Sequence, residues 1–399
     1  MKILFLTSRL PYPPHRGDKL HIFNVIKQLS RQGHEINLIS FIASRKEEQN
    51  VKGLMEFCSS VKTIVQRPTT SLAKCLLGLF SPLPFQVLYF SSRKMSRTVS
   101  RELAANKYDL IHVHLIRMAQ YGDEMAEPKR VLDLTDAGSL YLERFLKSTK
   151  NPFMRLFLKI ELGRLKRYER ILDRFDVSLV CSEVDAGVLH VRSPRANIDL
   201  LYNGIDLEYF SVNGAAHPDP GRIIYAGNMS YYPNIDGALF LINEIFPKIK
   251  RSITYAKLYI VGQNPPPSLR RLGSDDIIVT GFVPDVRVQY LQSVVAVAPI
   301  RFGAGTLYKI LEPMALGIPV VATSVAAEGL AILDGKDVLI ADSADGFAES
   351  VIRVLNDSKL QISLGSSGQS IVRNKYDSKI IAGRLDTIYH QVLRTPTVQ

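Results

Sequence analysis

The amino-acid sequence predicts an α/β protein with two parallel β-sheets, each covered by helices. Short apolar runs alternate with stretches of helical periodicity, and this alternation is present in two successive blocks. The chain has 399 residues, which is too long for one ordinary hydrophobic core. Apolar residues make up 46% and charged residues 22%, as in a soluble globular protein. We therefore expect two doubly wound domains, with ligands bound at the carboxyl ends of the strands.

The first block begins with a buried strand at Lys2–Thr7. A helix follows over Asp18–Gln32, with Asp18 as N-cap, apolar residues at helical spacing and Gly33 at its end. Later strands are expected at Ile36–Phe41, Val61–Val65, Leu110–Val113, Val131–Leu134 and Val177–Cys181, with a polar helix over Ser92–Lys107.

The second block begins after the sequence Asn203-Gly-Ile-Asp206. It is expected to contain strands at Arg222–Gly227, Lys257–Gly262, Ile277–Gly281 and Val294–Pro299, a helix over Ile235–Ile249 and a final amphipathic helix over Asp377–Leu393.

The segment Arg301–Thr323 predicts a nucleotide site. It reads as a glycine-bearing loop, a short helix with Lys309 and Glu312, a turn at Gly317 and an apolar strand. Backbone N–H groups and the helix N-terminus attract an anion, and Lys309 adds a full positive charge. Glu312 lies on the same helix face and can accept hydrogen bonds from vicinal hydroxyls. The alternative is a structural corner between a strand and a helix, as in any parallel sheet.

The same segment carries a family resemblance. Glu312 with the sequence Met314-Ala-Leu-Gly-Ile-Pro-Val-Val321 resembles the nucleotide-sugar segment of retaining glycosyltransferases of family four, which have the GT-B fold. The loop around Gly305 resembles a subgroup from bacterial exopolysaccharide clusters. The family pattern has an earlier glutamate, and Ala304 stands at its position.

The resemblance implies two Rossmann-like domains that face one another across a crevice. Residues 1–203 would form the acceptor-side domain and residues 204–376 the nucleotide-sugar domain, with 377–399 returning to the first domain. The implied activity is transfer of a hexose, with retention, from a nucleoside-diphosphate sugar to a glycan or lipid-linked acceptor in cell-surface polysaccharide synthesis. Neither a metal nor another cofactor is implied.

The resemblance also assigns roles on the donor side. Relatives carry an Arg and a Lys after the first strand of the second domain, and this chain has neither there, so we infer that Arg301 and Lys309 replace them. Glu312 would bind the ribose hydroxyls. The remaining donor-binding candidates are Gly305 and Thr306 for the diphosphate, Val283 for the base, and Asn228.

On the acceptor side, Gly17 and Asp136 are the catalytic candidates. Gly17 matches a glycine of the loop that closes on donor and acceptor, and Asp136 stands near a family histidine that contacts the transferred sugar. The alternative for Asp136 is a helix cap. His112 and His114 share a strand face, but without a nearby Cys or carboxylate in sequence they favour packing over a metal site.

Three other functions compete with this interpretation of the sequence. A nucleotide-sugar epimerase or hydrolase of the same fold needs several carboxylates and histidines, and only Asp133, Asp136 and the two histidines are apparent. A dinucleotide-dependent oxidoreductase is disfavoured because the first strand leads into prolines instead of a Gly-x-Gly-x-x-Gly loop. A catalytically silent nucleotide-sugar-binding scaffold stays open because of Ala304.

The net charge of +12 indicates an acidic partner. No zinc-finger spacing, aromatic RNA-binding signature or basic arm is present, so no nucleic acid is expected. Two segments favour an anionic membrane surface: the basic amphipathic helix Lys147–Arg174 and the apolar stretch Leu72–Phe90, which Pro82 and Pro84 interrupt. Each could instead pack on its own domain.

Cysteine usage and the first residues indicate the compartment. Cys58, Cys75 and Cys181 are odd in number and widely spaced, which argues against a disulfide framework and fits a reducing cytoplasm. The apolar start at Met1–Thr7 is too short for a signal peptide or a spanning helix. We expect a cytoplasmic protein that is peripheral on the inner face of the cytoplasmic membrane.

Overall fold

The computed structural model describes residues 1–122, 127–211 and 218–395, and the chain divides into two compact units. Unit 1 comprises Met1–Asn203 and Ile381–Gln399, and unit 2 comprises Gly204–Ile380. The returning segment begins at Ile381, because Asp377 still pairs with Ile205 of unit 2. Residues 396–399 of that segment lie outside the described ranges.

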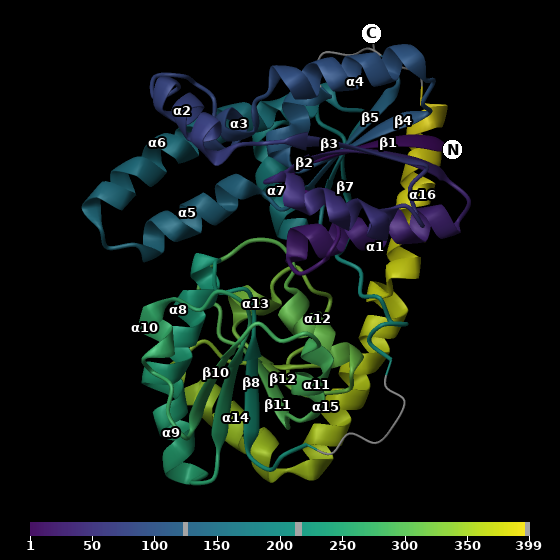
Figure 1. The fold of residues 1–399 in the computed structure, drawn as a ribbon. Helices are drawn as coiled ribbons and strands as arrows, with labels where there is room; N and C mark the ends of the chain where they lie inside the picture. Colours follow the sequence, from purple (N-terminus) through teal and green to yellow (C-terminus); the bar gives the residue numbers. More distant parts are fainter. Residues whose placement is uncertain (123–126, 212–217, 396–399) are drawn as a thin grey trace. The chain divides into compact units, whose positions relative to one another are not determined.

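Unit 1 is built on a parallel sheet of seven strands in the order β3-β2-β1-β4-β5-β6-β7. Helices lie on both sides of this sheet (Figure 1). The strands are β1 Lys2–Thr7, β2 Glu35–Ile42, β3 Ser60–Val65, β4 Leu110–His114, β5 Lys129–Thr135, β6 Val177–Val180 and β7 Ile198–Leu200. The helices are α1 Gly17–Arg31, α2 Pro68–Leu77, α3 Phe85–Phe90, α4 Arg93–Ala105, α5 Gly138–Ser148, α6 Pro152–Tyr168, α7 Glu183–Arg192 and α16 Ser378–Arg394, with 3-10 segments η1 Arg45–Leu54, η2 Ile116–Tyr121 and η3 Glu169–Arg174.

Apolar residues explain the central strands of unit 1. Strand β1 is buried along almost its whole length, as parallel strands covered on both faces must be. Helix α16 completes the same core, because Leu385, Ile388 and Tyr389 pack among the side chains of β1 and β2. The hydroxyl of Tyr389 lies 2.7 Å from Nδ1 of His112 on β4, which fixes the helix against the sheet.

Unit 2 contains a parallel sheet of six strands in the order β10-β9-β8-β11-β12-β13, again with helices on both sides (Figure 1). The strands are β8 Arg222–Ala226, β9 Lys257–Val261, β10 Ile277–Gly281, β11 Val295–Ala298, β12 Val320–Ala322 and β13 Leu339–Ile340. The helices are α8 Tyr232–Phe240, α9 Phe246–Ser252, α10 Pro267–Arg270, α11 Val286–Leu291, α12 Tyr308–Ala315, α13 Ser324–Ala327, α14 Ala344–Asn356 and α15 Ser358–Ile371, with π-helical turns η4 Leu241–Ile245 and η5 Val372–Tyr376.

The expected helices differ from the structure in three places. Helix α1 begins at Gly17, and Asp18 pairs with arginines in the first turn instead of capping it. The helix expected over Ile235–Ile249 is divided by the π-helical turn η4, and Pro247 lies in the first turn of the next helix, α9. The basic stretch Lys147–Arg174 is not one helix, because Asn151 and Pro152 start α6 anew after α5 has ended.

No helix within the described ranges is both long enough and apolar enough to cross a lipid bilayer.

Candidate functional site

Each sheet has a position at which the chain reverses the direction of its winding. In unit 2, β8 and β11 are neighbours, but β8 leads to β9 and β10 on one side while β11 leads to β12 and β13 on the other. Ligands of open parallel sheets bind beyond the carboxyl ends of the strands at such a point. The segments that leave β8 and β11 carry Asn228 and Lys309, so the sequence-predicted donor residues lie at the switch point.

Lys309 on α12 is buried, with only 9% of its surface exposed. Its ammonium donates to Oδ1 of Asn234 at 2.6 Å and to the hydroxyl of Tyr225 at 3.2 Å. Tyr225 in turn donates to the Asn234 carbonyl at 3.0 Å. The same ammonium lies 4.5 Å from the centre of the Tyr225 ring. Burial lowers the pKa of Lys309 to about 7, and the nearby Glu312 only partly opposes this.

The ammonium of Lys309 lies beside the β8–α8 loop, where relatives would carry their own cation. A Cβ atom on Gly227 would lie 3.2 Å from Nζ of Lys309, so this position suits glycine. Gly262, which follows β9 with φ of +149°, approaches the carbonyl of Gly227 so closely that a Cβ would lie 1.8 Å from it. The two glycines let the loops meet and leave room for the lysine from α12.

Glu312 lies one turn further along α12. Its carboxylate accepts a hydrogen bond of 3.0 Å from the hydroxyl of Tyr290 on α11. Burial raises the pKa of Glu312 to about 7, although Tyr290 and Lys309 act in the opposite direction. Lys309 and Glu312 therefore form a coupled acid–base pair close to neutrality, which is typical of functional sites.

Arg301 is exposed and already has a partner. Its Nε and Nη2 donate to the two oxygens of Asp236 on α8 at 2.9 and 2.6 Å, and its guanidinium carbon lies 4.8 Å from the centre of the Phe240 ring. This bidentate pair holds the side chain at the edge of the β11–α12 loop.

The other donor-side candidates lie on loops around this centre. Gly305 has φ of +74°, a conformation that favours glycine, and the following Thr306 is buried. The carbonyl of Asn228 accepts from Asn234 at 2.8 Å, so Asn228 supports the residue that holds Lys309. Val283 is half-buried in the loop before α11, the helix that carries Tyr290.

In unit 1, His21 and His112 lie against one buried carboxylate, that of Asp133. Nε2 of His21 lies 2.7 Å from Oδ2 of Asp133, and Nε2 of His112 lies 3.4 Å from the same oxygen. Burial would raise the pKa of Asp133, but the histidines hold it well below its ordinary value. His114 stacks on His21 at 5.9 Å. Among the described residues, no group of three His, Cys, Asp or Glu side chains is arranged to hold a metal ion.

At the carboxyl edge of the unit 1 sheet, Asp136 interacts electrostatically with Asp18, the residue that follows Gly17. Burial and Asp185 raise the pKa of Asp136 to about 7, although Arg117 lowers it. Thr135, which precedes Asp136, has φ of +68°, a strained conformation for a β-branched residue. Asp18, next to Gly17, interacts with both Asp136 and Arg117.

Several residues of both sites were missed from the sequence. Asn234, Tyr225 and Tyr290 hold Lys309 and Glu312, but they lie on α8, β8 and α11, and no local sequence pattern joins these elements to α12. Arg117 could have been recognised from the sequence, because it is a cation only three positions beyond a strand that is buried throughout. His21 lay on the buried face of a predicted helix, where a polar residue indicates a partner.

Comparison with known protein families identifies the class. The model described as Glycosyltransferase Family 4 matches residues 17–209, and the model described as Glycosyl transferases group 1 matches residues 220–357. Two Rossmann-like units with these matches define a GT-B glycosyltransferase. The chain belongs to glycosyltransferase family 4.

Two relatives match most of the chain. An uncharacterised 44.6 kDa protein in the cps region of Klebsiella pneumoniae is 21% identical over 396 residues, which are 95% of this chain and 97% of that protein. The phosphatidyl-myo-inositol mannosyltransferase of Mycolicibacterium smegmatis is 25% identical over 309 residues, 74% of each chain.

Solved structures share the fold. Sucrose-phosphate synthase from Thermosynechococcus elongatus superposes with a TM-score of 0.74 and 18% identity, covering 98% of this chain and 99% of that chain. Anabaena HepE in complex with UDP-glucose superposes with a TM-score of 0.68 and 16% identity, covering 98% of this chain and 100% of that chain.

Proposed function

We propose that the protein is a retaining glycosyltransferase that transfers a hexose from a nucleoside-diphosphate sugar to a glycan or lipid-linked acceptor in cell-surface polysaccharide synthesis. The observation that carries the proposal is the Lys309–Glu312 pair at the switch point of unit 2. A buried cation held only by uncharged side chains suits a diphosphate, and a carboxylate one turn away suits the ribose hydroxyls. The cps-region relative supports the polysaccharide context.

Lys309 would stabilise the departing diphosphate without a metal ion. The ammonium is held by Asn234 and Tyr225, so little reorganisation is needed when negative charge develops on the leaving group. The uridine nucleotide in the HepE complex makes a UDP-sugar the first donor to test. Arg301 would join the site only by leaving Asp236.

Retention follows from the family resemblance, and unit 1 supplies a residue suited to contact the sugar. Asp136, with a pKa of about 7, can accept a hydrogen bond from a sugar hydroxyl or donate one to it at neutral pH. In this proposal the departing phosphate oxygen takes the acceptor proton on the same face of the sugar, so Asp136 acts as a positioning and electrostatic group.

The test is release of nucleoside diphosphate from a panel of nucleotide sugars, with and without a membrane lipid extract. Release that requires the extract and is lost in Glu312→Gln supports the transferase. Release at the same rate without any acceptor would indicate a hydrolase. Tight donor binding with no release would indicate a silent scaffold. Retention is read from the anomeric coupling constant of the product.

We further propose that unit 1 associates with an anionic membrane from the cytoplasmic side. Apolar side chains of α2, the loop after it and α6 are exposed together, here called the α2–α6 surface: Leu72, Leu76, Leu77, Leu79, Phe80, Phe153, Leu156, Phe157 and Ile160. Phe80 is fully exposed and Leu77 is 87% exposed. An apolar cluster of this kind on one face is typical of an interaction site.

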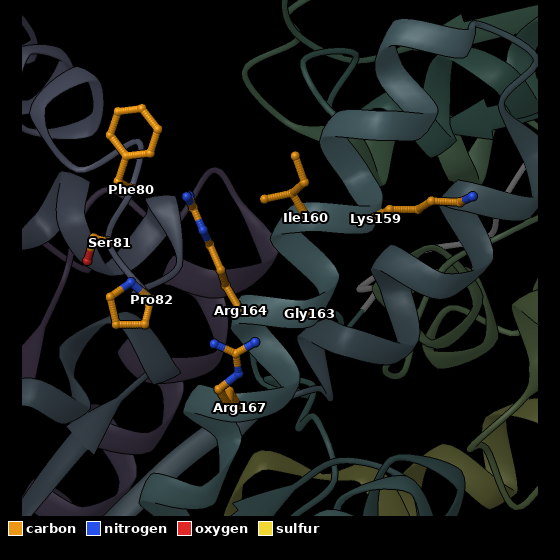
Figure 2. Close-up of a pocket in the computed structure, with 8 residues that line it drawn as sticks. All are labelled: Phe80, Ser81, Pro82, Lys159, Ile160, Gly163, Arg164 and Arg167. Carbon is orange, nitrogen blue, oxygen red and sulfur yellow. The ribbon is translucent and has the colours of Figure 1, made fainter.

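Specific contacts make this one surface. The ring of Phe85 stacks on Phe157 at 5.6 Å, and its N–H donates to Glu161 of α6 at 2.7 Å. Arg164 lies 4.6 Å from the Phe85 ring and donates to the Leu79 carbonyl. Figure 2 shows Arg164 extending from α6 toward the loop with Phe80 and Pro82, along a pocket of about 430 Å³.

Exposed cations border this apolar surface. Lys159 and Arg167 line the pocket, and both are exposed. Apolar side chains that enter the headgroup region and cations that attract anionic headgroups are the two components of interfacial binding.

Vesicle sedimentation tests the membrane proposal. The double variant Lys159→Gln/Arg167→Gln should weaken binding to phosphatidylglycerol vesicles about 30-fold, since each cation near the surface contributes about 1 kcal/mol. Lys94→Gln/Arg97→Gln on α4 is the matched control and should bind like the wild type. Equal binding of wild type and the α6 variant, or binding that 0.5 M KCl does not weaken, refutes the proposal.

A further inference from the structure

We propose that Arg9, Arg16 and Arg117, at the carboxyl edge of the unit 1 sheet, bind an oxyanion that the acceptor carries. This inference rests on the proposed function and deepens it, because it names the acceptor's chemical class. The acceptor would present a phosphate, a diphosphate or a carboxylate close to the hydroxyl that receives the sugar.

The three arginines gather at the switch point of unit 1. Strands β1 and β4 are neighbours there, and the connections run from β1 toward β3 and from β4 toward β7 in opposite directions. Arg9 follows β1 and Arg16 precedes α1, and both pair with Asp18, the latter at 3.5 Å. Arg117 lies on η2, which follows β4, with its guanidinium carbon 5.2 Å from the centre of the Phe90 ring.

The cluster contains buried nitrogen atoms that lack partners. Nε of Arg117, a donor, is buried and has no hydrogen-bond partner among the residues that the structure describes, and neither has the ring nitrogen Nε2 of His114 at the end of β4. Both side chains interact electrostatically with Asp18. A buried donor without a partner is costly, so its persistence at a ligand-binding edge indicates that a ligand supplies the acceptor atom.

The charge balance of the cluster is positive. Three arginines face Asp18 and Asp136, and Asp136 is only partly ionised at neutral pH because burial raises its pKa to about 7. Burial and repulsion by Arg9 lower the pKa of Arg117 to about 10. Like charges that crowd together are retained where a counter-charge is bound in the functional state.

The chemistry of the side chains selects the ligand. Guanidinium groups present parallel N–H donors that match the oxygens of phosphate and carboxylate, whereas a neutral sugar hydroxyl gains little from them. Unit 2 has its own cation for the donor diphosphate in Lys309. The unit 1 arginines are therefore assigned to the acceptor, and binding of donor phosphates by them is the competing outcome of the test.

Calorimetric titrations of the full-length protein, saturated with UDP, test the assignment. The probes are inorganic pyrophosphate, octyl glucoside as neutral probe, octyl glucuronide as carboxylate probe and glucosyl octyl phosphate as phosphate probe. The variants are Arg117→Gln and the exposed Arg16→Gln, which keeps the test valid if the buried change impairs folding. Arg97→Gln on α4 is the matched control.

We expect the anionic probes to bind, and each cluster variant to weaken them at least about tenfold while Arg97→Gln has no effect. The tighter of the phosphate and carboxylate probes then identifies the acceptor group. Binding of the neutral probe as tightly as the anionic ones, or unchanged binding in both variants, overturns the proposal. Loss of UDP affinity with unchanged probe binding also overturns it, because the arginines would then serve the donor.

Failure of the proposed function gives a different pattern. If neither UDP nor another nucleotide binds, pyrophosphate is titrated alone. If Arg117→Gln abolishes pyrophosphate binding and Lys309→Met leaves it intact, the result supports the arginine site without the transferase. If Lys309→Met abolishes the binding and Arg117→Gln leaves it intact, the arginine site is refuted.

Discussion

The Lys309–Glu312 pair makes nucleotide affinity depend on pH in a defined way. Lys309 can bind the diphosphate strongly only as an ammonium, and burial lowers its pKa from 10.5 to about 7. Glu312 can accept hydrogen bonds from both ribose hydroxyls only as a carboxylate, and burial raises its pKa from 4.5 to about 7. Affinity should therefore be highest near pH 7 and fall on both sides.

The size of each effect follows from these values. About one tenth of Lys309 is protonated at pH 8 and about one hundredth at pH 9, so UDP affinity should fall about tenfold per pH unit above 7. The fall from 10.5 to about 7 corresponds to roughly 5 kcal/mol, part of which a bound diphosphate returns as it raises the pKa of the ammonium. Protonation of Glu312 should lower UDP affinity about tenfold at pH 6 relative to its maximum.

The assay is calorimetric titration of UDP between pH 6 and 9, repeated in two buffers of different ionisation enthalpy. The wild type should take up close to one proton per UDP at pH 8. Lys309→Met should bind about 10- to 100-fold more weakly at pH 7 and lose the alkaline decline, and Glu312→Gln should lose the acidic one. Lys336→Met, an exposed lysine of unit 2, is the matched control.

A flat profile for the wild type would refute the assignment of Lys309 to the diphosphate. An alkaline decline that persists in Lys309→Met would also refute it, because another group would then be the titrating cation.

Three further changes test the packing around the two sites. Arg301→Gln should weaken UDP binding less than about threefold, and Asp236→Asn should strengthen it by freeing the arginine. Calorimetric titration measures both, and a large loss of UDP affinity in Arg301→Gln with no gain in Asp236→Asn would show that Arg301 binds the phosphates without leaving Asp236. Gly262→Ala should lower the free energy of unfolding by about 3 kcal/mol, since its Cβ would lie 1.8 Å from a carbonyl oxygen. Gly281→Ala, which has open space around it, should lower it by about 1 kcal/mol. Urea unfolding followed by circular dichroism measures both, and equal losses would contradict this reasoning. Tyr389→Phe should cost about 2 kcal/mol in the same assay because it leaves a buried imidazole nitrogen unpaired, and a neutral change would show that the hydroxyl does not hold α16.

Most strands of the two sheets could be predicted from the sequence, because parallel strands buried on both faces are continuous apolar runs. Strand β1 and strand β10 begin and end at the expected residues. Strands β7 and β13 were missed, since two or three residues carry no periodicity, whereas the equally short β12 lies in a longer apolar run that predicts a strand. The break before α6 was missed because the basic and apolar pattern continues through Asn151 and Pro152.

The candidate site was only partly accessible from the sequence. Lys309 and Glu312 are separated by three positions on one helix, so local spacing predicted their proximity. Their partners Asn234 and Tyr290 come from other helices, and no local pattern joins them to α12. Arg301 could not be recognised as an ion-paired residue, because Asp236 is 65 positions away in the chain.

The central claim is that the Lys309–Glu312 site holds a nucleotide sugar for transfer to an acceptor. The direct measurement is the transfer of a radiolabelled sugar from its nucleotide to the lipid fraction of a membrane extract. Wild-type protein should label the lipid, and Glu312→Gln and Lys309→Met should each reduce the rate at least about tenfold. Labelling by both variants at the wild-type rate would contradict the account.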